Sequence, residues 1–78
     1  MPRALNNIAR EIRNDWKRMS IHAKPYVDAM LELDSINDNY YADSGKSVVL
    51  YFLSNASTWR GETAKRVKAE LRAMAGIK

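Results

Sequence analysis

Gly45, Lys46 and Ser47 match the last residues of the phosphate-binding loop that many nucleotide-hydrolysing proteins place between a strand and a helix. The first glycine of that motif would fall at residue 40, which is Tyr40, and no strand pattern precedes it. The glycine-rich cradle for a phosphate is therefore missing. We predict instead that this tripeptide begins a helix and that Gly45 is required because a larger residue would not fit at that position.

Carboxylates gather in one polar segment, at Asp34, Asp38 and Asp43. An EF-hand calcium loop needs oxygen ligands at alternating positions, a central glycine and a closing glutamate, and no register here supplies that set. We interpret these residues as turn formers and a helix cap. His22 is the single histidine and there is no cysteine, so no histidine or thiolate metal cluster is expected. The sequence predicts no metal, no cofactor, no catalytic residue and no enzyme activity.

Basic side chains recur at helical spacing in two places, which could place cations along phosphates. The first stripe consists of Arg10, Arg13 and Lys17, and the second of Lys65, Lys68 and Arg72. A small nucleic-acid-binding protein or transcriptional regulator is thus one hypothesis, with a helix-turn-helix built from the last two helices as its geometry. The alternative is that both stripes are solvated faces of amphipathic helices.

Four further residues are candidates for binding a partner protein. Trp59 and Arg60 belong to the types most enriched at interface hot spots, and Tyr40 and Tyr41 lie in the acidic segment. The alternative for Trp59 is that it closes one end of a small core while Arg60 pairs with a carboxylate. We expect the partner surface to combine the Trp59–Arg60 junction with the acidic loop.

The elements that carry these residues are predicted to form an all-α fold, a compact bundle of four short helices. The helices are expected at residues 4–19, at 25–33 beginning with Pro25, from Asp43 or Ser44 through about residue 56, and from Ser57 or Thr58 to about Ala75 with Gly76 as the stop. The run from Val48 to Leu53 is apolar on every side, which predicts a central third helix. In the intervening loop, residues 34–43, Ile36 and at least one of the two tyrosines should pack onto the core.

The chain has 78 residues and a net charge of +4, which predicts a single helical domain over residues 1–78. The lack of cysteine, of a signal peptide and of a long apolar run predicts an intracellular location without membrane association. Charge is segregated: residues 25–45 contain five acidic and no basic side chains, and the flanking segments are basic. This pattern suits an acidic partner, and it equally suits a homodimer held by unlike patches.

Several segments resemble a group of small uncharacterised proteins encoded by actinobacterial phages and prophages. The resemblance covers residues 8 to 74 and is carried by residues 47–64, 68–71, 12–17 and 25–30. It implies an accessory protein expressed in the host bacterial cytoplasm, and it brings no catalytic residues with it. Short phage proteins of this kind often bind a host protein or help to control gene expression.

Together these observations give two functional hypotheses. The first is a non-enzymatic phage-encoded accessory protein that binds a host protein and inhibits host growth or defence. The alternative is the small basic nucleic-acid-binding protein built on the two stripes. Whether the stripes share one face of the folded chain separates the two.

Overall fold

The first helix begins where the apolar pattern begins. In the computed structural model, which describes residues 3–76, α1 spans Leu5–Asp15 and buries its apolar stripe of Leu5, Ile8 and Ile12. The predicted end at residue 19 is wrong, because the backbone leaves the helix at Trp16, whose N–H still donates to the carbonyl of Ile12 at 2.8 Å. This early exit lets the indole of Trp16 pack into the core.

The second helix is short. α2 spans Lys24–Met30, and Pro25 occupies its first turn as predicted, where the missing N–H removes no helical hydrogen bond. The predicted end near Leu33 is too late. Leu33 is nevertheless buried, and its carbonyl accepts a hydrogen bond from the N–H of Asn6 at 2.9 Å. The turn after α2 therefore caps the start of α1.

The segment predicted as a loop contains a small antiparallel hairpin. β1 is Asn39–Tyr40 and β2 is Asp43–Ser44, with Tyr40 opposite Asp43 in the register. The fold is thus mainly helical and the prediction of a purely all-α fold is wrong in this detail. Ile36 and Tyr40 pack against the core while Tyr41 is exposed, so the expectation that Ile36 and one tyrosine return to the core is confirmed.

The third helix, α3, spans Gly45–Ser54 and is capped by Ser44, whose Oγ accepts a hydrogen bond from the N–H of Ser47 at 3.1 Å. The apolar run from Val48 to Leu53 is helical, but it is not buried on every side. Three of its side chains are buried, two are partly buried, and Tyr51 is 53% exposed; the buried three are Val48, Val49 and Phe52.

The last helix, α4, spans Glu62–Ala75 and ends at Gly76 in a left-handed conformation with φ 78°, as predicted. Its start is later than expected. Ser57 and Thr58 do not cap it; they belong to a turn that carries Trp59, and Gly61 is the N-cap with φ 113°. The connection between α3 and α4 therefore runs over residues 55–61, which is longer than the three- or four-residue turn of a helix-turn-helix motif.

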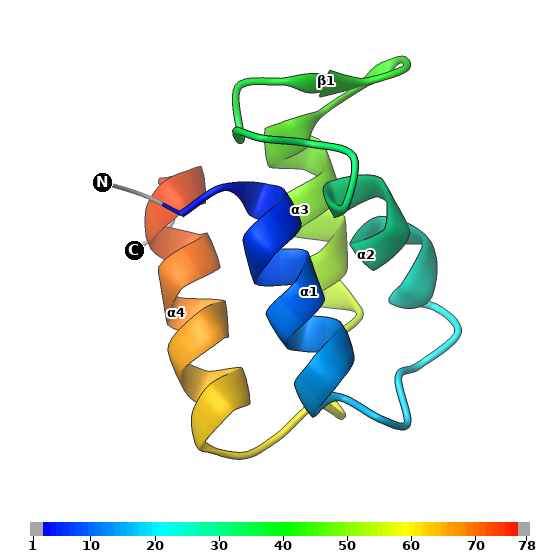
Figure 1. Cartoon of the computed structure of the whole chain (residues 1–78), viewed down its shortest axis with the longest axis vertical. Helices are drawn as coiled ribbons and strands as arrows, with labels where there is room; N and C mark the ends of the chain where they lie inside the picture. Colours follow the sequence, from blue (N-terminus) through cyan, green and yellow to red (C-terminus); the bar gives the residue numbers. More distant parts are fainter. Residues whose placement is uncertain (1–2, 77–78) are drawn as a thin grey trace.

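The four helices form a closed ring, and neighbouring helices in this ring run in opposite directions (Figure 1). α1 packs against α2 and α4, and α3 packs against the same two helices. α3 thus packs against two neighbouring helices, as α1 does, and is not a central helix surrounded by the other three. The core fills the middle of the ring; its largest fully buried side chains are Phe52, Leu5, Ile8, Ile12, Met30, Leu71, Val27, Val49 and Val67.

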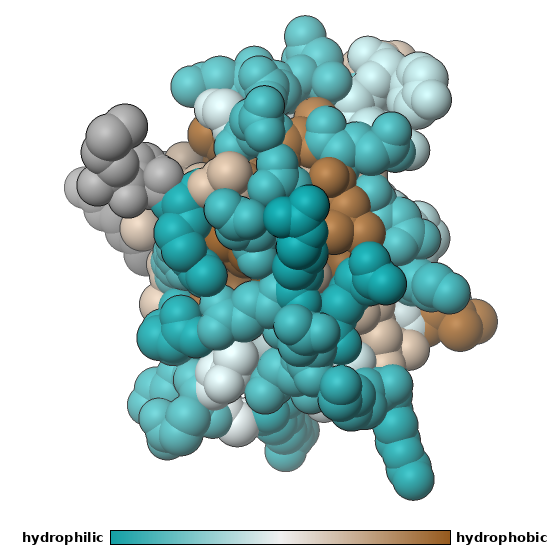
Figure 2. Space-filling model, in the orientation of Figure 1, coloured by the Kyte–Doolittle hydropathy of each residue, from teal (hydrophilic) through white to brown (hydrophobic). Residues whose placement is uncertain are grey.

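The ring topology sets the two ends of the molecule apart. The hairpin lies at one end, and the connection between α3 and α4 lies at the other together with the connection between α1 and α2 (Figure 1). On the face seen in Figure 2 hydrophilic residues cover most of the surface, with apolar atoms visible in patches. Among residues 3–76 no helix combines the length and the apolar character that crossing a bilayer requires.

Candidate functional site

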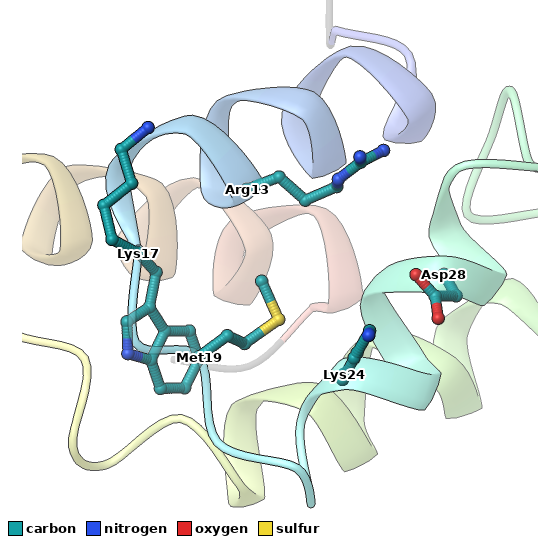
Figure 3. A pocket seen from close by; sticks show the side chains of 6 residues that line it. Arg13, Lys17, Met19, Lys24 and Asp28 are labelled. Carbon is teal, nitrogen blue, oxygen red and sulfur yellow. The ribbon is translucent and has the colours of Figure 1, made fainter.

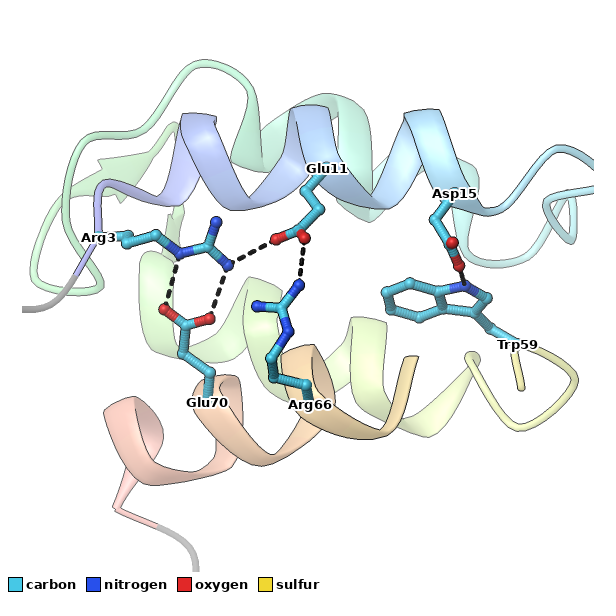
Figure 4. A network of polar contacts seen from close by, with 6 residues as sticks. All are labelled: Arg3, Glu11, Asp15, Trp59, Arg66 and Glu70. Atoms are coloured by element: carbon cyan, nitrogen blue, oxygen red, sulfur yellow. Dashed lines mark hydrogen bonds and ion pairs between the residues drawn. The ribbon is translucent and has the colours of Figure 1, made fainter. Parts of the chain in front are cut away.

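Trp59 is part of the core and not of the surface. Its ring is stacked on Trp16, with the centroids 5.7 Å apart and an angle of 10° between the planes, and it meets Phe52 edge to face at 6.2 Å. The indole Nε1 donates to Oδ2 of Asp15 at 2.8 Å, and the residue is 2% exposed (Figure 4). The alternative stated for Trp59, that it closes one end of the core, is therefore confirmed. Its role in partner binding stays a prediction, and the buried ring presents little surface to a partner.

Arg60 follows on the outside of the same connection and is exposed. The expected ion pair is not found, since no carboxylate within residues 3–76 lies within salt-bridge distance of its guanidinium. The backbone here is held by Lys68, whose Nζ donates to the carbonyl of Trp59 at 2.6 Å and lies 5.9 Å from the centre of the indole ring. Lys68 thus ties α4 to the connection that precedes it.

The predicted partner surface also fails as a single patch. Trp59 and Arg60 lie at the end of the bundle opposite to the hairpin that carries Tyr40 and Tyr41 (Figure 1). Of the two parts of this surface, the hairpin retains an exposed aromatic ring, because Tyr41 is 86% exposed whereas Trp59 is 2% exposed. Of the four candidates, the structure therefore leaves the tyrosine pair as a possible protein contact and places Arg60 on a different, cationic surface.

A four-residue ion-pair network joins α1 to α4. Arg3 forms a bidentate contact with Glu70, at 2.9 Å from Nε and 2.7 Å from Nη2, and also lies 2.8 Å from Oε1 of Glu11. Arg66 pairs with the other oxygen of Glu11 (Figure 4). Hydrogen bonds from Arg66 and Arg3 lower the pKa of Glu11, and those from Arg3 lower the pKa of Glu70. The basic side chains of this seam are thus neutralised within the fold.

The network predicts a specific acid sensitivity. Because the folded-state pKa of Glu70 lies below its usual value of 4.5, its stabilising effect is complete above that pH and is lost as the pH falls through the lower, folded value. We expect the melting temperature of the wild type to fall more steeply below about pH 4.5 than that of Glu70→Gln. Thermal unfolding followed by circular dichroism at several pH values measures this; Glu32→Gln, an exposed carboxylate outside the network, is the control. Parallel curves for wild type and Glu70→Gln would contradict the role given to the pair.

The two basic stripes lie on different faces. Glu11 of α1 and Arg66 of α4 face one another, and successive helical residues are rotated by about 100°. Arg10 and Arg13 therefore lie on the flank of α1 turned toward α2, and Lys65 and Lys68 on the flank of α4 turned toward α3. The sequence left open whether the two stripes share a face, and in the structure they do not. The stripe on α4 lies within one helix, whereas α1 ends at Asp15 and Lys17 follows in the turn beyond it.

The stripe on α1 borders a hollow of about 330 Å³ between α1 and α2. Arg13 and Lys17 line it from one side and Lys24 and Asp28 from the other, with Met19 between them (Figure 3). Arg10 lies outside this hollow and donates to Oδ1 of Asn7 at 3.1 Å. The charge of this face is therefore mixed, because the carboxylate of Asp28 shares the hollow with the cations.

The stripe on α4 borders a larger and more uniformly basic hollow. It has a volume of about 440 Å³, and its charged lining is Arg60, Lys65, Lys68, Arg72 and the single carboxylate Glu62. Burial, together with the nearby charges of Arg72 and Arg60, lowers the pKa of Lys68. We refer to this surface as the α4 hollow. Repulsion between its cations is not relieved by an ion pair among residues 3–76.

Two of the three acidic residues, Asp34 and Asp38, are used for local structure as predicted, whereas the cap of α3 is Ser44 and not Asp43. Oδ2 of Asp38 accepts hydrogen bonds from the N–H groups of Asp34 and Ser35, both at 3.0 Å, and Oδ1 of Asp34 accepts one from Nδ2 of Asn6 at 2.8 Å. Within residues 3–76 no group of three metal-ligating side chains comes together. His22 is exposed in the connection between α1 and α2.

Sequence reasoning missed the conformation of the hairpin turn. Tyr41 has φ 54°, which is rare for a residue other than glycine, asparagine or aspartate. Tyr41 and Ala42 give none of the usual signals of a two-residue hairpin turn. It also missed two exposed apolar side chains, Ile21 at 79% and Tyr51 at 53%, the latter stacked on Tyr26.

Comparison of the chain with protein-family models, with curated proteins and with solved structures found no match.

Proposed function

We propose that this chain is a non-enzymatic accessory protein of an actinobacterial phage or prophage that binds a host protein in the bacterial cytoplasm and thereby limits host growth or defence. The phage origin and the location follow from the sequence resemblance. The binding role is supported by the hairpin turn, where the side chain of Tyr41 is exposed to solvent although its backbone conformation is unfavourable.

Tyr41 is the observation on which the proposal depends. It is 86% exposed and its ring meets that of Tyr40 edge to face, with the centroids 4.7 Å apart. A non-glycine residue in the left-handed region costs about 1 kcal/mol or more, and such strain concentrates at binding sites. Tyrosine supplies large contact area with little loss of side-chain entropy, which is why it is enriched in protein interfaces.

The residues around Tyr41 are held in place by contacts with the core and with the start of α3. Tyr40 packs against the core, and burial together with the neighbouring carboxylate of Glu32 raises its pKa. Gly45 donates its N–H to the carbonyl of Asp38 at 2.7 Å, which ties the hairpin to the start of α3. A partner would thus meet a fixed aromatic ridge formed by the two tyrosines, flanked by the exposed carboxylate of Asp43.

The test is a pair of matched tyrosine variants. Tyr41→Gly relieves the strained backbone and removes a solvent-exposed ring, so we expect the free energy of unfolding to stay level or rise by up to about 1 kcal/mol while binding is lost. Tyr51→Ala removes the other exposed tyrosine ring, on the face between α2 and α3, and should leave binding intact. Capture from an actinobacterial lysate, with each variant and the wild type as bait, measures the difference.

The outcomes separate clearly. A host protein captured by the wild type and by Tyr51→Ala but not by Tyr41→Gly supports the proposal. Equal capture by all three proteins, or a growth effect on expression that Tyr41→Gly retains, would show that the hairpin is not the contact. Thermal unfolding of each variant verifies that lost capture reflects the surface and not the fold.

A further inference from the structure

The α4 hollow concentrates positive charge, and the fold uses one of its cations, since Lys68 donates to the carbonyl of Trp59. Arg3 and Arg66 are paired with carboxylates, whereas Arg60, Lys65 and Arg72 are exposed and without an ion pair among residues 3–76. Lys68 lies among them, and its pKa is lowered first by burial and then by the nearby charges of Arg72 and Arg60. A surface of this kind gains free energy when anionic groups of a ligand enter it.

We propose that the α4 hollow is a nucleic-acid-binding surface that contacts the phosphates of a duplex through Arg60, Lys65, Lys68 and Arg72. The inference is independent of the function proposed for the hairpin, since no residue of the hairpin lines the α4 hollow. It uses one of the two basic stripes identified in the sequence, the one on α4, together with Arg60.

The spacing of the cations suits a phosphate backbone. Lys65, Lys68 and Arg72 follow one another along a single flank of α4, and a rise of 1.5 Å per residue places the first and last about 10 Å apart along the axis. This is close to the rise of three base pairs in B-form DNA, at about 3.4 Å each. Arg60 extends the row beyond the start of α4, where the helix dipole adds partial positive charge.

The chemistry of the face favours phosphate over an acidic protein. Protein interfaces depend on apolar or aromatic anchors at their centre. The three large apolar side chains most exposed in residues 3–76 are Ile21, Tyr41 and Tyr51, and none of them lines the α4 hollow. Trp59 lines it but is 2% exposed. What the hollow offers is therefore charge, which binds phosphates without reading sequence.

The hollow between α1 and α2 is the less favourable of the two basic faces. Each hollow is lined by one carboxylate, Asp28 or Glu62, but the α4 hollow has four basic side chains in its lining and the other has three. Each face nevertheless has three exposed basic side chains that can be replaced by glutamine. They are Arg10, Arg13 and Lys17 on one face, and Arg60, Lys65 and Arg72 on the other. This makes the α1 face a control that is matched in net charge.

The experiment measures binding of a fluorescein-labelled sixteen-base-pair DNA duplex by anisotropy at several salt concentrations. Four phosphate contacts predict that log K falls against log salt with a slope of about −3 to −4, which is roughly a hundredfold loss between 50 and 200 mM. The triple variant Arg60→Gln, Lys65→Gln, Arg72→Gln should reduce the slope to about −1. Lys68 is kept in this variant, because it also holds the backbone of Trp59.

The control triple variant is Arg10→Gln, Arg13→Gln, Lys17→Gln, which removes the same charge from the other face and should leave the slope unchanged. Glu62→Gln should tighten binding about twofold by removing the one carboxylate at the hollow. Equal weakening by both triple variants would show binding by net charge alone, and absence of binding at 50 mM would also overturn the proposal. If polyglutamate competes as well as unlabelled duplex at equal charge, the hollow binds acidic polypeptides and the assignment to nucleic acid is wrong.

Discussion

Replacement of Trp59 by alanine is expected to lower the melting temperature by more than about 15 °C, the largest effect of any single substitution considered. Loss of a buried tryptophan costs about 3–5 kcal/mol, because the transferred area is lost and a cavity is left behind. A domain of this size has a free energy of unfolding of about 4–12 kcal/mol in total. Trp59 is stacked on Trp16 and meets Phe52 edge to face, so both of these rings lose an aromatic neighbour when Trp59 is replaced by alanine.

Two variants separate this structural role from a role in binding. Trp59→Phe keeps an aromatic ring but removes the hydrogen bond from the indole to Asp15, and should cost about 1–2 kcal/mol. Arg60→Ala, next in the chain and exposed, should change stability by less than about 0.5 kcal/mol. Urea unfolding followed by circular dichroism gives all three values. A Trp59→Ala protein as stable as Arg60→Ala would mean that the aromatic cluster does not hold this end of the core.

The number and type of the helices could be predicted from the sequence because their signals are local. Apolar residues at helical spacing mark the buried side of α1, and Pro25, Ser44 and Gly76 mark helix ends by their own chemistry. The choice of a helix for Val48 to Leu53 is also confirmed. Each of these predictions needs only the few residues around it.

The errors arise where distant contacts decide the local structure. The spacing of Trp16 fits a continued helix, yet the chain turns there and the indole stacks on Trp59, which is 43 positions later in the sequence. The start of α4 is delayed for a related reason, since the connection before it must bring Trp59 into the core. Neither the early end of α1 nor the late start of α4 is indicated by the types of the residues around it.

The placement of the basic stripes could not be predicted from the sequence for the same reason. Each basic stripe follows from helical spacing alone. The structure preserves the stripe on α4, but Lys17 of the first stripe lies beyond the end of α1. Their relative placement depends on how α1 and α4 are rotated about their axes, which the packing of the apolar stripes and the pairing of Glu11 with Arg66 determine. Spacing within one helix contains no information on that rotation.

Gly45→Ala is the second substitution with a large expected effect. A Cβ at this position would lie 2.8 Å from the carbonyl oxygen of Ile36 and 3.0 Å from that of Asp38, both shorter than the roughly 3.3 Å of a close carbon–oxygen contact. Both obstacles are backbone atoms, so no side chain can rotate away. The hairpin segment would have to move off the start of α3 and lose the hydrogen bond from Gly45 to Asp38. We expect a loss of about 2–3 kcal/mol, measured by urea unfolding.

The comparison with Lys46→Ala decides why the glycine is there. Gly45 is not among the residues with positive φ, so space and not backbone freedom requires it. Lys46 is exposed and its replacement should change stability by less than about 0.5 kcal/mol. A phosphate-binding loop predicts the reverse pattern: ATP would raise the melting temperature of the wild type, and Lys46→Ala would abolish that rise. Because the backbone of residues 36–38 occupies the space beside Gly45, we expect no ATP-dependent rise and a destabilising effect confined to Gly45→Ala.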